Sequence, residues 1–165
     1  MQKRLKEYDD ITVPINEIAH HINDILNNRR ADLYFDSIVL LYSFIENMVK
    51  WLVCMKILWD KSDKVIEAKE VKIIRAFCKR MNFSTAQEIA LSIKLIDFEL
   101  YKRIDGIRDE RNSIIHQFWL YAHRGNRLVL RKKLEKLAHI ANQIVRLFNG
   151  LTKKIGVEEV YELFV

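Results

Sequence analysis

The chain has 165 residues, of which half are hydrophobic and 30% charged; this is the composition of one globular domain and excludes a disordered chain. Four glycines and one proline are too few for the many turns of a β-sandwich or barrel. Lys and Arg outnumber Asp and Glu by 28 to 22, for a net charge of +6. We therefore expect an all-α, single-domain bundle of about five to six helices over residues 1–165, with a basic surface.

Apolar spacing predicts three helices in the first half of the chain. The first covers about 12–28 and has Pro14 in its first turn, where proline is tolerated. The second, about 32–59, is apolar on nearly every side and is expected to be central and buried. The third follows a loop at 60–63 and runs to about Met81, with apolar residues at Ile66, Ile73, Ile74 and Phe77.

The second half of the chain predicts three more helices and a short helix in the tail. Ser84 and Gln87 have the spacing of a capping box, so Ser84 is expected to open a fourth helix. A fifth helix runs from about Asp97 to a turn at 124–126, with Gly106 as a weak point inside it. The last long helix, about 128–155, carries an apolar seam with alternating spacings of four and three, and the tail at 157–165 adds a short final helix. The seam consists of Leu130, Leu134, Leu137, Ala141, Ile144, Phe148 and Leu151.

Targeting and membrane signals are not found in the sequence. The first residues lead into no apolar run, and the most apolar stretch, 38–59, is interrupted by Glu46, Lys50 and other polar residues. Cys54 and Cys78 lie inside apolar helical patterns without CxxC spacing, as buried reduced thiols do. We expect a cytoplasmic protein that makes no membrane contact.

The excess positive charge is confined to one segment. Residues 111–136 contain seven bases and one acid, so the other 139 residues hold 21 bases and 21 acids. A concentrated basic surface is typical of a protein that binds a polyanion, although a solvated helix face gives the same pattern. The candidate phosphate-binding residues are Arg108, Arg124, Arg127, Arg131, Lys132 and Lys133.

The fifth predicted helix carries the residues most suited to chemistry. Arg108, Asn112 and His116 recur every four residues and form one polar stripe. Arg111 instead falls among the apolar positions of the same helix, where an arginine is costly unless it is paired. Glu46 or Asp36 on the second helix are its expected partners, and a structural ion pair explains Arg111 as well as a catalytic role does.

The segment Arg111-Asn112-Ser113-Ile114-Ile115-His116 resembles the Arg, four to six residues, His motif of HEPN domains, in which a polar residue often follows the arginine. Its place in a late helix, with one long helix after it, is also similar to that family. Glu46 and Lys50 are similar to polar positions that some members place near the site.

The resemblance implies a metal-independent endoribonuclease of the toxin or phage-defence type that needs no cofactor, acts on RNA as a homodimer and has an antitoxin protein as a further partner. In it His116 is the general acid or base of 2′-hydroxyl attack, Arg111 the phosphate clamp, and Asn112 a positioning residue. On an ideal helix Arg111 and His116 lie about 140° apart, so a two-fold pair of chains is expected to complete the site.

Two other functions are compatible with the same residues. A noncatalytic helical module would bind RNA or protein through the basic segment alone. A structural bundle would bind a partner along the seam from Leu130 to Leu151. Accessible His116 in a basic surface distinguishes the nuclease from both.

Overall fold

The computed structural model describes residues 2–60, 68–116 and 126–155, and all regular structure in these ranges is helical. The six helices are α1 (Gln2–Asn27), α2 (Tyr34–Asp60), α3 (Ala68–Arg80), α4 (Phe83–Ser92), α5 (Phe98–His116) and α7 (Arg127–Ile155). The predicted all-α bundle is therefore confirmed for the described part of the chain. The predicted turn at 124–126 falls largely outside it, and the helix expected at 157–165 falls wholly outside it.

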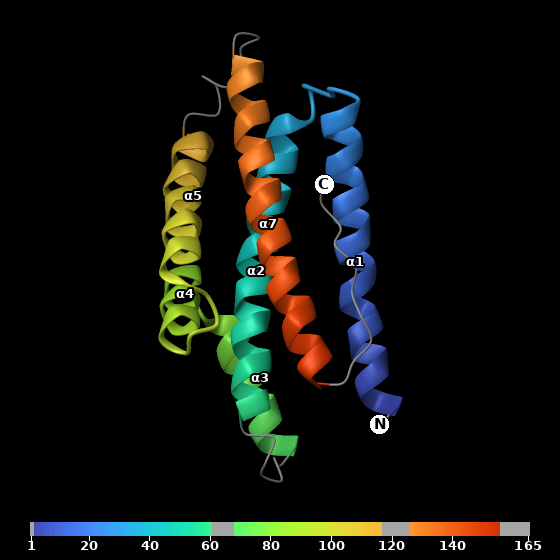
Figure 1. Cartoon of the computed structure of the whole chain (residues 1–165), viewed down its shortest axis with the longest axis vertical. Coiled ribbons are helices and arrows are strands. Elements are labelled where there is room, and N and C mark those ends of the chain that lie inside the picture. Colours follow the sequence, from blue (N-terminus) through green and yellow to red (C-terminus); the bar gives the residue numbers. More distant parts are fainter. Residues whose placement is uncertain (1, 61–67, 117–125, 156–165) are drawn as a thin grey trace.

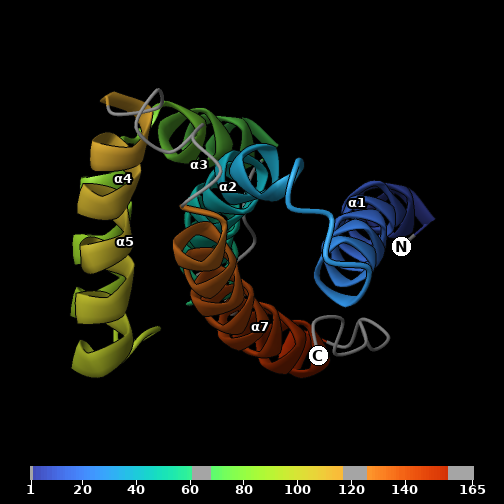
Figure 2. The same ribbon diagram turned by 90° about the horizontal axis from the view of Figure 1, so that it is seen from above.

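Helices α2 and α7 pack along each other at the centre of the bundle and share its largest contact. Helix α1 lies on one side of this pair, and α4 and α5 lie on the other (Figures 1 and 2). Helix α5 ends and α7 begins at the same end of the molecule (Figure 1). This arrangement brings the motif of α5 to the end of the bundle where the basic segment of α7 starts.

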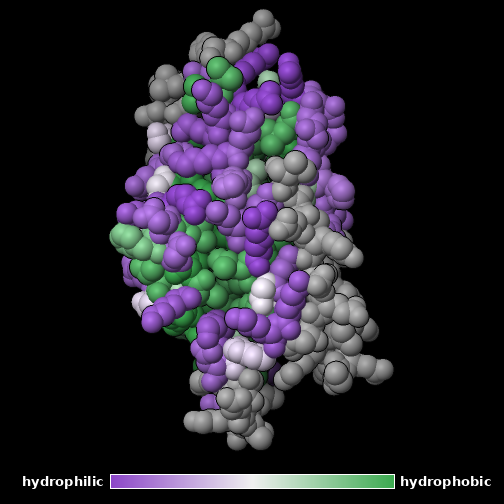
Figure 3. Space-filling model, viewed as in Figure 1, coloured by the Kyte–Doolittle hydropathy of each residue, from purple (hydrophilic) through white to green (hydrophobic). Residues whose placement is uncertain are grey.

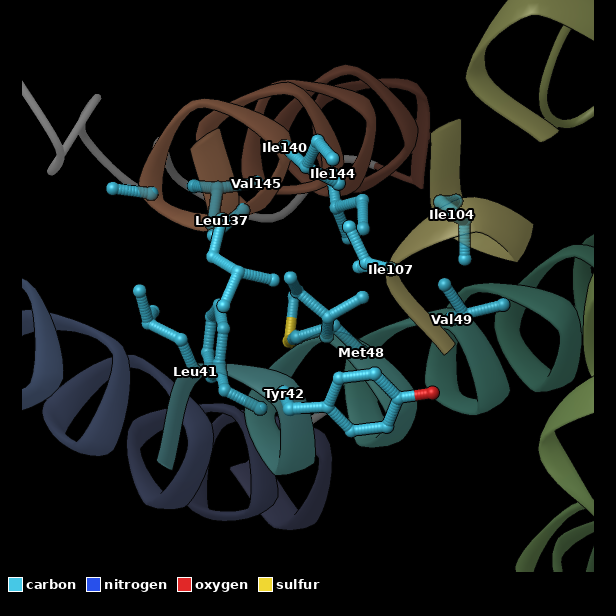
Figure 4. Packing of buried hydrophobic residues seen from close by; sticks show 14 of the residues in the cluster. Leu41, Tyr42, Met48, Val49, Ile104, Ile107, Leu137, Ile140, Ile144 and Val145 are labelled. Carbon is cyan, nitrogen blue, oxygen red and sulfur yellow. The ribbon is translucent and has the colours of Figure 1, made fainter. Parts of the chain in front are cut away.

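The core forms between the apolar faces of α2, α7 and α5, as the close view of Leu41, Met48, Ile107 and Ile144 shows (Figure 4). The predicted seam of α7 is confirmed, because all seven of its residues are buried. Burial of apolar surface on this scale is the main stabilising contribution in a helical bundle. Helix α2 is buried on most of its circumference, with Leu40 and Trp51 as exceptions at 37% and 38% exposure.

Helix α2 is also the one described helix with the length and hydropathy of a membrane span. A central bundle helix has the same properties, and 56% of its most apolar window is buried against the rest of the chain. The two cysteines are buried and reduced, as expected from their apolar surroundings.

Two local predictions were wrong. Helix α1 begins at Gln2 and not near residue 12, so Pro14 lies in the helix interior; residues 2–7 are mostly strong helix formers that extend the helix. The cap of α4 is Asn82, whose side-chain oxygen accepts a hydrogen bond from the Thr85 amide at 2.8 Å.

The predicted third helix is confirmed as α3, which ends at Arg80 and packs against α2. Ile74 packs against the core, whereas Ile73 and Phe77 are 67% and 47% exposed.

Candidate functional site

Arg111 lies against the central helix through an aromatic ring. Its guanidinium carbon is 4.7 Å from the centre of the Tyr42 ring, within the range of a cation–π contact. The Nε atom of Arg111 is buried and has no hydrogen-bond partner among the described residues, while the residue as a whole is partly exposed. Tyr42 therefore fixes the direction of the guanidinium.

The partner predicted for Arg111 was wrong. Within the described residues no ion pair joins Arg111 to Glu46 or Asp36, and Glu46 instead accepts a 2.7 Å hydrogen bond from Lys50 on its own helix. The prediction failed because helical spacing gives the face of Arg111 but not the residue of α2 that packs against it.

Tyr42 is 1% exposed, and its hydroxyl has no hydrogen-bond partner in the described part of the chain. Burial raises the pKa of Tyr42 to about 12, although the nearby positive charge of Arg111 acts in the opposite direction. The phenol is consequently protonated at neutral pH. Figure 4 shows its oxygen directed away from the aliphatic side chains of Leu41 and Leu137.

The other two motif residues lie in the last two turns of α5. Asn112 is exposed and free to contact a ligand from solvent. His116 is the last residue of the helix, and its side chain falls outside the described residues. The structure thus places Arg111 and Asn112 on neighbouring faces at the end of α5, with the backbone of His116 just beyond them.

Arg108 belongs to a contact between α5 and α4. Its Nη1 atom donates a 2.9 Å hydrogen bond to the Ser84 hydroxyl, and its Nη2 atom pairs with Asp105 at 2.9 Å. Arg108 is therefore a bridge between two helices as well as a partly exposed cation.

The predicted phosphate-binding residues of α7 differ in whether they form an ion pair with an acidic side chain. Arg131 pairs with Glu135 at 2.8 Å, and Lys133 faces Glu110 of α5 at 3.9 Å. Arg127 and Lys132 are exposed, and no ion pair within the described ranges includes either of them. Arg124 lies outside the described residues.

Glu110 connects the motif helix to the basic helix. It accepts a 2.6 Å hydrogen bond from Lys136 in addition to its longer contact with Lys133. These contacts fix the end of α5 beside the first turns of α7. The motif and the basic segment are therefore neighbours in space as well as in sequence.

Sequence reasoning did not identify the α4 residues that face this region. Gln87, which we expected to cap α4, is fully buried, and neither end of its amide has a hydrogen-bond partner among the described residues. Nothing in its sequence context distinguishes it from an exposed capping residue. Sequence reasoning also missed Tyr42, because its apolar sequence neighbours are those of an ordinary aromatic residue of the core.

The described residues contain no group of three or more His, Cys, Asp or Glu that could hold a metal ion. Comparison of the chain with family models, with curated proteins and with solved structures gave no match.

Proposed function

We propose that the chain is a metal-independent endoribonuclease of the HEPN type, with a toxin or phage-defence role, that cleaves RNA at the end of α5. The observation that carries the proposal is the Arg111 guanidinium held over Tyr42, on the same helix end as Asn112 and His116. A phosphate clamp needs a cation whose position is fixed before the substrate arrives. The contact with Tyr42 supplies that fixed position.

The reaction follows from the properties of these side chains. His116 removes a proton from the ribose 2′-hydroxyl or donates one to the leaving 5′-oxygen, since histidine exchanges protons near neutral pH. Arg111 stabilises the charge on the phosphorane through its planar donors. Asn112, exposed beside Arg111, positions the RNA backbone or the imidazole.

Substrate binding is supported by the charge beside the motif. Exposed Arg127 and Lys132 lie on the helix that Glu110 joins to α5. Phosphates of a single-stranded RNA passing over this end of the bundle would contact both residues. Such contacts bind RNA of any sequence alike.

The homodimer is part of the proposal, because one chain separates Arg111 from His116 by about 140° around the helix. On the face shown in Figure 3, an apolar patch lies in the region of α5, α2 and α7 and is surrounded by hydrophilic residues. A second copy of the chain is the occupant we expect for that patch, since two-fold pairing there sets two copies of the motif helix close together.

The experiment that tests the proposal is incubation of the purified chain with mixed RNA in excess EDTA, followed by identification of the product ends. Attack by the 2′-hydroxyl leaves a cyclic or 3′ phosphate and a 5′-hydroxyl. Products with 3′-hydroxyl ends contradict the mechanism. Binding without cleavage favours the noncatalytic module, for which exposed Arg127 and Lys132 suffice.

A further inference from the structure

Three polar side chains between α2, α4 and α5 are buried without partners. The Tyr42 hydroxyl, both ends of the Gln87 amide and Nε of Arg111 make no hydrogen bond within the described residues. Gln87 is 0% exposed and Tyr42 1%. Buried polar groups are almost always paired in folded proteins, so a cluster of unpaired ones points to a partner that the described residues do not supply.

Tyr42 and Gln87 both lie next to the first turn of α4, and Arg111 lies over the Tyr42 ring. The Phe83 ring packs edge-on against Tyr42, with 5.8 Å between the ring centres. Gln87 lies one turn after Phe83, and helical side chains tilt toward the N-terminus, so its amide leans over that first turn. Arg108 reaches the same turn through its hydrogen bond to Ser84.

The chemistry of this cluster suits an anion that accepts several hydrogen bonds. The cluster holds two guanidinium groups, which only donate, together with two hydroxyls and one amide, which both donate and accept. The N-terminus of α4 adds the positive end of the helix dipole, while its Thr85 amide is already bonded to Asn82. Ser84 and Arg108 are partly exposed, so solvent reaches the cluster from their side.

Carboxylates near the cluster are already engaged or lie at its rim. Glu46 pairs with Lys50, and Arg108 pairs with Asp105 at 2.9 Å and faces Asp109 at 3.9 Å. Glu88, which is exposed, accepts a 3.3 Å hydrogen bond from the Ser84 hydroxyl. An incoming anion would replace Asp105 and Glu88 as the acceptor for Arg108 and Ser84.

We infer that Ser84, Gln87, Arg108 and Arg111, together with Tyr42, form a binding site for a phosphate group at the N-terminus of α4. The ligand is inorganic phosphate or the phosphate of a nucleotide. This site does not depend on RNA cleavage, although it shares Arg111 with the proposed phosphate clamp.

The test measures thermal unfolding of the full chain in increasing inorganic phosphate, with potassium chloride at matched ionic strength as reference. Phosphate that binds only the folded chain raises the unfolding temperature progressively. Arg108→Gln should weaken phosphate binding roughly tenfold or more, since it removes a charged donor. Arg103→Gln, which removes the same charge from another partly exposed position of α5, is the matched control and should bind phosphate as the parent does.

Gln87→Leu separates a binding role from a structural one. It removes two unpaired buried atoms while keeping the side-chain volume similar, so the phosphate-free protein should be as stable as the parent or more stable. Its affinity for phosphate should nevertheless fall roughly threefold to tenfold. A variant that unfolds at lower temperature without phosphate yet binds phosphate normally overturns the inference, as does a parent that phosphate stabilises no more than chloride.

A second arm identifies the source of the phosphate. Adenosine 5′-monophosphate and adenosine are compared with inorganic phosphate in the same unfolding experiment. Tighter binding of the nucleotide than of phosphate assigns the site to a nucleotide or RNA end, and equal binding assigns it to free phosphate. Equal stabilisation by adenosine and its monophosphate overturns the phosphate site.

Discussion

The guanidinium of Arg111 is stacked on the ring of Tyr42, with the guanidinium carbon 4.7 Å from the ring centre. Because Glu46 is paired with Lys50, removal of Arg111 leaves no buried carboxylate without a partner. The energetic role of Arg111 is therefore that of a cation–π contact.

We predict that Arg111→Ala lowers the free energy of unfolding by about 1–2 kcal/mol, the size of a partly buried cation–π contact. Urea unfolding at neutral pH measures the change. A loss of about 3–5 kcal/mol is typical of a broken buried ion pair, and that result would contradict the contact described here. Arg111→Ala should also abolish RNA cleavage while most of the fold's stability remains.

His116→Ala should reduce RNA cleavage by roughly 10²-fold or more, the contribution of a general acid or base. The melting temperature should stay close to that of the parent, because the sequence predicts His116 on the polar stripe of its helix. His139→Ala is the matched control, because His139 is an exposed histidine of α7. Equal cleavage by the parent and His116→Ala would place the activity elsewhere or in a contaminant.

RNA binding should depend strongly on salt, and Arg127 and Lys132 should carry part of that dependence. The double variant with Gln at both positions is expected to reduce the slope of log affinity against log salt by about 1.4, since each single-strand phosphate contact contributes about 0.7. Lys133→Gln should reduce it less, because Lys133 faces Glu110. Filter binding across a salt series measures the slopes, and an unchanged slope in the double variant rules out these phosphate contacts.

The raised pKa of Tyr42 predicts a loss of stability at high pH. Its pKa is about 12 in the folded chain, against an ordinary value of 10.0, so the folded state binds this proton more tightly. The stabilising contribution is present below about pH 10 and disappears as pH rises through 12, a change of at most about 3 kcal/mol. In Tyr42→Phe this part of the pH dependence should be missing, and urea unfolding between about pH 9 and pH 12 measures the difference.

Sedimentation equilibrium at tens of micromolar should give the mass of two chains. A dimer is expected because the two motif residues of one chain point in different directions around α5. A mass of one chain at all concentrations would contradict a site shared between two subunits.

The sequence was most informative where one periodic pattern decides the structure. The seam of α7 became a buried face because few alternatives satisfy so many apolar positions at helical spacing. Ile73 and Phe77 of α3 remain 67% and 47% exposed, since apolar spacing cannot show whether a second helix covers a given face.

The site could be predicted only in part. The residue types of the sequence identified the end of α5 as the candidate site. The residues that contact it belong to α2 and α4, more than 20 positions away in the sequence. The choice between Asn82 and Ser84 as the cap shows the same difficulty on a smaller scale. Both residue types cap helices well, and the burial of Gln87 is a tertiary effect that local sequence does not encode.

RNA and the Glu110 carboxylate of α5 compete for the same two lysines, Lys133 and Lys136. An RNA phosphate that recruits Lys133 or Lys136 must displace the Glu110 carboxylate, and α5 then loses an electrostatic tie to α7. Such a partly exposed ion pair contributes at most about 1 kcal/mol, and the buried Ile104 and Ile107 keep α5 packed in the core. Neutralising Glu110 would remove the competition, so that both lysines are available to RNA before any substrate arrives.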